Sequence, residues 1–204
     1  MRVPAKALSR YPTYLRPFFL NQRRKYGQVL QAALLWARSP KLFMAVAILY
    51  GVIDRRSSPI DPALRSLVTV RVSQINACPF CVDLNSSTLF NRGVRMEKVD
   101  ALGDWRRSSL FDTREQIVLA YAEAMTRSEQ RVDDPMIDDL KRYFDDDAIV
   151  ELTALIAFQN MSSKFNSALG VPAQGFCKRP SERSFSPRDQ EVSSRSEASE
   201  AASP

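Results

Sequence analysis

The sequence predicts an all-α fold, a bundle of seven to eight helices, on three observations. Apolar residues recur at helical spacing through the central segments of the chain. Several of these segments begin with a helix-starting pair such as Asp61-Pro62. No two neighbouring segments supply the paired strand signals that a sheet requires.

The first helices cover residues 27–38 and 41–53. Ser39 is the expected N-cap of the second, and Pro40 suits its first turn. The next begins at Asp61-Pro62 and runs to Ile75. Residues 67–72 of this segment have strong β propensity, yet a helix is favoured because nothing else in the chain offers a partner strand.

Later helices are recognised mainly by their ends. Cys78–Phe90 should carry Pro79 in its first turn, with Asn76 or Cys78 near the cap, and end at Gly93. A short helix over 96–102 should stop at Gly103. The remaining predicted starts are a capping box of Asp112 and Glu115 for 113–127, Asp134-Pro135 for 135–144, and Asp146 or Asp147 for 148–169. The expected buried stripe of that last helix is Ile149, Leu152, Ile156, Met161 and Phe165.

Both ends of the chain differ from this helical domain, which we place at 27–177. Residues 1–26 form a basic, aromatic arm, and residues 1–53 hold nine Lys and Arg and no acid. Pro4, Pro12 and Pro17 should interrupt an amphipathic helix there. The tail, residues 178–204, has eight serines and almost no large apolar groups, so we expect it to be disordered.

Composition excludes several classes of function. The chain has three cysteines and no histidine, which rules out Ser-His-Asp triads and Cys-His dyads. An odd count with two cysteines close together is atypical of a secreted disulfide framework, and a cytoplasmic location is expected. The longest apolar run has 12 residues, whereas a membrane span needs about 20.

The chemistry-bearing feature is the pair Cys78 and Cys81, three residues apart at an expected helix start. A helix N-terminus favours the thiolate, and this spacing allows a disulfide to close across one turn. The pair therefore indicates thiol–disulfide exchange or peroxide reduction. Two buried apolar cysteines remain an alternative. A zinc site is disfavoured because Cys177 is the only further strong ligand, and we expect neither metal nor cofactor.

The stretch Leu67–Asp83, LVTVRVSQINACPFCVD, resembles the signature of the carboxymuconolactone decarboxylase and alkylhydroperoxidase D superfamily. The run Ile149–Asn160 is similar to that family's C-terminal core helix. Together with the helix order, the resemblance covers about residues 28–173. It implies an alkylhydroperoxidase D-like helical bundle that assembles into trimers or hexamers.

The resemblance also implies roles for individual residues. In the peroxidase members the second cysteine is the nucleophile and the first resolves it, and these positions match Cys81 and Cys78. The family's relay glutamate and histidine fall on Ser66 and Asn85, so both proton-relay groups are absent here. Asn85 shares a helix face with both cysteines, and Arg71 and Asp83 are further candidate supporting residues.

These observations favour an oxidoreductase that acts on a peroxide or small disulfide through the Cys78/Cys81 pair, with a dithiol electron donor. The alternatives are a non-catalytic homo-oligomer of the same fold, a carboxymuconolactone decarboxylase-type activity, and a glutaredoxin-like protein, which would need a sheet. Nucleic-acid binding by the basic arm is less favoured than packing on the domain or a neighbouring subunit.

Overall fold

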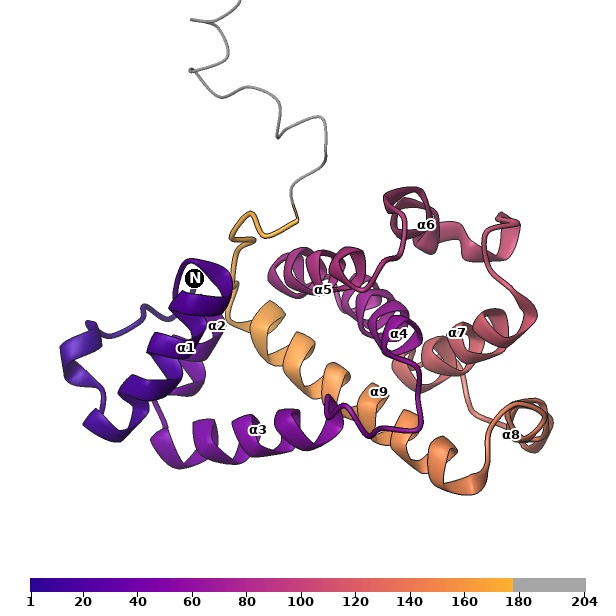
Figure 1. Ribbon diagram of the computed structural model, residues 1–204, viewed down its shortest axis with the longest axis horizontal. Helices are drawn as coiled ribbons and strands as arrows, with labels where there is room; N and C mark the ends of the chain where they lie inside the picture. The colour runs from indigo at the N-terminus through magenta and orange to yellow at the C-terminus, as the bar shows by residue number, and fades with distance from the viewer. Residues whose placement is uncertain (178–204) are drawn as a thin grey trace, which may run out of the picture.

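The structure, a computed structural model, describes residues 1–177. Every regular element in that range is a helix, and there is no strand (Figure 1). The all-α prediction is confirmed. The α-helices are α1 (Arg16–Tyr26), α2 (Gln31–Trp36), α3 (Pro40–Ile53), α4 (Pro62–Ile75), α5 (Pro79–Asn91), α6 (Met96–Ala101), α7 (Thr113–Thr126), α8 (Asp134–Lys141) and α9 (Asp146–Ala168). Three 3-10 helices add Leu8–Arg10, Thr13–Leu15 and Leu102–Arg107. The predicted disordered tail lies outside the described residues.

Helix α4 forms the centre of the bundle and packs against α5, α7 and α9 (Figure 1). Its β-branched run is buried on more than one face: Val68 and Val72 join one apolar cluster, and Leu67 and Val70 join another. Neighbours on several sides explain why strong β propensity gives way to a helix here, since tertiary packing overrides a weak local preference.

Two predicted helix starts are wrong by one or two residues. The cap of α8 is Asp133 rather than Asp134, and the cap of α9 is Asp145 rather than Asp146 or Asp147. In each case the carboxylate accepts the backbone N–H three residues further on, and runs of aspartate offer several equivalent candidates for this role. The Asp61 cap of α4 and the capping box of α7 are confirmed.

Two other local predictions are also wrong. Met161 is 41% exposed and does not belong to the buried stripe of α9. Gly103 does not end the helical segment after α6. A 3-10 helix continues from Leu102 to Arg107 and buries Trp105. This 3-10 turn is held by the apolar cluster around Trp105 rather than by its own sequence.

The N-terminal arm is folded. Pro17 begins α1 instead of interrupting it, because the first turn of a helix does not need the missing N–H. Tyr11, Leu15 and Phe19 are buried in one cluster with side chains of α2 and α3. Arg2 donates to the carbonyls of Ser167 and Ala168, so the N-terminus lies against the C-terminal end of α9.

Within residues 1–177, no helix combines the length and the apolar character that crossing a bilayer requires. The division into an arm, a domain from residue 27 and a tail from residue 178 stays a prediction.

Candidate active site

The turn between α4 and α5 positions the cysteine pair. The N–H of Cys78 donates to the carbonyl of Ser73 and that of Ala77 to Gln74, which is the double hydrogen bond of a Schellman motif. Ala77 takes the left-handed position of this motif, with φ +47°. The chain therefore reverses within two residues, and Cys78 becomes the N-cap of α5 with Pro79 in its first turn.

Cys78 and Cys81 form a disulfide, with their Cα atoms 5.3 Å apart. This confirms the predicted disulfide reach across the first turn of one helix. The Sγ of Cys78 accepts the backbone N–H of Cys81 at 3.2 Å. Within this turn the helix N-terminus therefore supports the sulfur of Cys78.

Both cysteines are almost fully buried, at 1% for Cys78 and 3% for Cys81. Cys81 lines a cavity of about 370 Å³, whereas Cys78 is not among its lining residues. A molecule in this cavity would meet the sulfur of Cys81 first. That asymmetry agrees with the division of roles that the family resemblance implies.

The cavity is lined by both apolar and polar side chains. Its walls include the rings of Trp36, Phe43, Phe80 and Phe158, contributed by α2, α3, α5 and α9. Ser66 and Asn85 line the same cavity as Cys81. Asn85 lies one turn beyond Cys81 on α5, whereas Ser66 lies on α4 at the part of the cavity that holds Arg92.

Neither Ser66 nor Asn85 is placed to act as a base. The Nδ2 of Asn85 donates to Ser73 Oγ at 3.2 Å, and Ser66 Oγ accepts from Arg92 at 2.8 Å. A serine hydroxyl and an amide do not take up protons at neutral pH. The two positions of the family's relay are therefore occupied by neutral groups held in local hydrogen bonds.

Arg71 lies outside the thiol environment. Its guanidinium pairs with Glu123 of α7, which also accepts from Trp105 and Arg106. Burial alone would raise the pKa of Glu123, but the hydrogen bonds from Arg106, Trp105 and Arg71 outweigh it and hold that pKa below its usual value. These contacts assign Arg71 to a buried ion-pair network between α4 and α7, not to a thiolate.

Asp83 holds the C-terminal segment of the described chain. Its carboxylate accepts the backbone N–H groups of Gln174, Gly175 and Cys177, each at 2.8 Å. The anchored segment places Val171 against the cysteines in one apolar cluster. Asp83 thus covers the disulfide indirectly, by fixing residues that shield it from solvent.

Asn166 is a site residue that sequence reasoning missed. Its Nδ2 lies 3.3 Å from Cys81 Sγ, and the side chain is buried and lines the cavity. Among the described residues its Oδ1 has no hydrogen-bond partner. Asn166 is 85 positions beyond Cys81 on α9, and no local pattern around it signals this contact.

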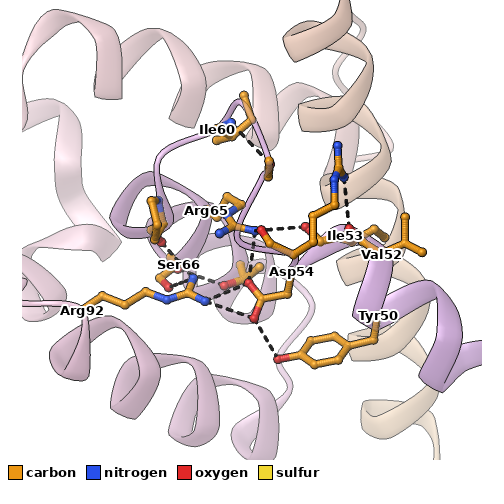
Figure 2. A network of polar contacts seen from close by, with 12 residues as sticks. Tyr50, Val52, Ile53, Asp54, Ile60, Arg65, Ser66 and Arg92 are labelled. Carbon is orange, nitrogen blue, oxygen red and sulfur yellow. Dashed lines mark hydrogen bonds and ion pairs between the residues drawn. The ribbon is translucent and has the colours of Figure 1, made fainter.

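A second missed feature is a polar cluster at the α3–α4 end of the cavity. Figure 2 shows Asp54 between the guanidinium groups of Arg65 and Arg92, with Ser66 and Tyr50 beside them. All five residues line the cavity. In residues 1–177, no group of three or more His, Cys, Asp or Glu side chains is arranged to hold a metal ion.

The comparisons with known proteins agree with this geometry. The carboxymuconolactone decarboxylase family matches residues 40–124. The uncharacterized protein YnjA of Escherichia coli (strain K12) is 44% identical over 177 residues, which cover 87% of this chain and 97% of YnjA. The uncharacterized protein YdfG of Bacillus subtilis (strain 168) is 27% identical over 116 residues, covering 56% and 79% of the two chains.

Solved structures share the fold. The alkylhydroperoxidase AhpD core protein of Ralstonia eutropha JMP134, described as peroxidase-related, superposes with a TM-score of 0.78 at 21% identity, covering 86% of this chain and 93% of that one. A cysteine-to-alanine variant of the debrominase Bmp8, in complex with 2,3,4-tribromopyrrole, gives a TM-score of 0.75 at 23% identity with the same coverage.

This is a helical protein with a vicinal thiol pair beside a mainly apolar cavity. The chain belongs to the carboxymuconolactone decarboxylase family, and its fold is that of the alkylhydroperoxidase AhpD core protein. Its fold and its cysteine pair fit thiol-dependent redox chemistry.

Proposed function

We propose that this chain is a thiol-dependent oxidoreductase in which the reduced Cys78/Cys81 pair delivers two electrons to an organic hydroperoxide bound in the cavity. The observation that carries the proposal is that Cys81 lines the cavity, whereas its disulfide partner Cys78 does not. The Cα atoms of the two cysteines are 5.3 Å apart. A reactive and a resolving thiol need this arrangement.

Atoms and electrons balance over one cycle. The thiolate of Cys81 attacks the terminal oxygen of the hydroperoxide, the O–O bond breaks, and an alkoxide leaves and takes a proton to become an alcohol. Cys81 is now a sulfenic acid. The thiol of Cys78 attacks its sulfur, water leaves, and the disulfide forms. An external dithiol then restores both thiols and is itself oxidised to a disulfide.

The character of the cavity supports an organic substrate. Its walls are mainly apolar and include several aromatic rings, and a volume of about 370 Å³ exceeds what hydrogen peroxide would fill. The debrominase that shares this fold is seen in complex with a halogenated pyrrole, so the fold accommodates an organic ring in that protein.

The rate should be modest. The amide of Asn166 is the side-chain donor that reaches Cys81, and it can stabilise a thiolate without removing a proton. Loss of a positioned general base typically lowers a rate by about 10²–10⁴-fold. We therefore expect slower turnover than in family members that keep the glutamate and histidine.

Steady-state consumption of cumene hydroperoxide with dithiothreitol as donor tests the proposal. Wild type should turn over and Cys81→Ser should not, whereas Cys78→Ser should turn over more slowly because dithiothreitol must then reduce the buried Cys81 sulfenic acid directly. Cys177→Ser serves as the matched control and should keep wild-type rates. Equal consumption by wild type and Cys81→Ser would favour the alternative of a non-catalytic helical protein.

A further inference from the structure

The cavity carries a charged end that the reaction above does not use. Asp54 at the end of α3 accepts two hydrogen bonds from Arg92, at 2.8 and 3.1 Å, and lies 3.4 Å from Arg65. The hydroxyl of Tyr50 is 3.5 Å from the same carboxylate. Figure 2 shows these side chains converging from α3, α4 and the end of α5.

The charges of this cluster do not cancel. Two guanidinium groups share one carboxylate, so the cluster has a net positive charge at a place where Arg65 is only 4% exposed. The Nε of Arg65 has no hydrogen-bond partner within residues 1–177. A buried cation with an unused donor is costly unless an anion or acceptor completes it.

The geometry of α5 connects this cluster to the thiols. Cys81, Asn85, Thr88 and Arg92 all line the cavity, and their spacings of four, three and four residues place them on one helix face. At 1.5 Å per residue, Cys81 and Arg92 are separated by roughly 16 Å along the helix axis. Leu84 and Phe158 add apolar surface to the same cavity.

The two ends of the cavity differ in what they present. The cationic end presents the guanidinium groups of Arg65 and Arg92, and the thiol end presents Cys81 and the amide of Asn166. A ligand with an anion at one end, an apolar body and a hydroperoxide at the other would match both.

We propose that the cavity binds an apolar monocarboxylic acid that carries a hydroperoxide, with its carboxylate on Arg65 and Arg92 and its hydroperoxide at Cys81. This assignment of substrate class rests on the proposed function, and the electrons follow the same balanced step. Arg65 and Arg92 are positioning and specificity residues that fix the reducible end of the molecule beside the sulfur.

The test separates binding from redox chemistry. Isothermal titration of the Cys81→Ser protein with 4-phenylbutanoate is compared with titration by its neutral amide, which has the same shape. The acid should bind at least about tenfold more tightly, because hydrogen bonds to a charged group are worth about 1.5–3 kcal/mol. Arg65→Gln and Arg92→Gln, each added to that protein, should weaken binding of the acid and bring the two ligands close to parity.

Arg55→Gln is the matched control, because Arg55 pairs with Glu151 and does not line the cavity. The Arg55→Gln protein should still bind the acid more tightly than the amide. Equal affinities, no binding of the acid, or a preference that survives both arginine changes would overturn the inference. If an arginine variant unfolds, the comparison of acid with amide in the unaltered cavity still decides.

The two proposals fail separately. Turnover of cumene hydroperoxide without any preference for the acid would overturn the anion site and leave the oxidoreductase in place. A preference for the acid in a protein that never consumes hydroperoxide would contradict the oxidoreductase and leave a binding site for apolar acids.

Discussion

At the scale of single residues, Glu123 is a buried carboxylate held by three side-chain donors. The donors are Arg71, Arg106 and Trp105. Removing one partner of a buried pair typically costs about 3–5 kcal/mol, because the other charge remains uncompensated. The network ties α7 to α4 and to the 3-10 turn that carries Trp105.

We predict that Glu123→Gln lowers the free energy of unfolding at neutral pH by about 3 kcal/mol. The folded-state pKa of Glu123 is depressed, so its contribution is fully present above the unfolded pKa of about 4.3 and is lost as the pH falls through the folded value. Urea unfolding across pH measures this. The difference in the free energy of unfolding between wild type and variant should close in acid. A difference that is constant with pH would contradict the prediction.

At the scale of elements, the α4–α5 turn sets the geometry of the thiols. Ala77 occupies the left-handed position with φ +47°, where a Cβ costs about 1–2 kcal/mol. Glycine is the usual residue here, since it adopts this conformation without that penalty.

Ala77→Gly should therefore stabilise the protein by about 0.5–1 kcal/mol, the relief of strain less the extra entropy of the unfolded chain. Equilibrium denaturation measures the change, and the Cys78–Cys81 disulfide should still form. A loss of stability would mean that the methyl group makes a contact that matters more than its strain. Ala173→Gly makes the same change at an exposed position in another loop, where φ is not positive, and should not stabilise.

Elements of the fold were predictable where the signal is local. Asp61-Pro62, the capping box at Asp112 and the Cys-Pro-Phe-Cys start of α5 each depend on a few neighbouring residues, and the structure agrees with all three. The folding of the N-terminal arm was not predictable from local signals, because the burial of Tyr11 and Phe19 depends on α2 and α3.

The site residues also divide into those with a local sequence signal and those without one. The Cys pair could be predicted from its spacing. The ion-pair partner of Arg71, Glu123, is 52 residues away, and the hydrogen-bond donor to Cys81, Asn166, is 85 residues away. Long-range pairs of this kind leave no periodic trace in a single sequence. The cluster of Asp54, Arg65 and Arg92 was missed for the same reason, since each of these residues alone resembles an ordinary surface charge.

At the scale of the whole molecule, α3 leaves an apolar face uncovered. Its exposed side chains are Leu42, Ile48, Leu49, Tyr50 and Val52, and Ile48 is 63% exposed. Several exposed large apolar side chains on one helix are typical of an interface. Together with the family resemblance, this supports the proposal that the chain forms a homo-oligomer, a trimer or a hexamer.

Light scattering at micromolar concentration should give a multiple of the chain mass of 23.1 kDa. Ile48→Glu should lower that mass, because a buried, unpaired charge at an interface is strongly unfavourable. Val132→Glu places the same charge on an exposed apolar residue elsewhere and should not change the assembly. A monomeric mass for the wild type would contradict the proposal.

The proposed activity requires that Cys81 and Cys78 act together as a two-electron couple serving the cavity. Intact-mass and peptide analysis of the reduced protein, after one equivalent of cumene hydroperoxide, tests this requirement. We predict the loss of two hydrogens, a disulfide mapped to Cys78 and Cys81, a thiol retained at Cys177, and no such change in Cys81→Ser. Hydroperoxide left unconsumed, or oxidation found at Cys177 with the pair still reduced, would contradict it.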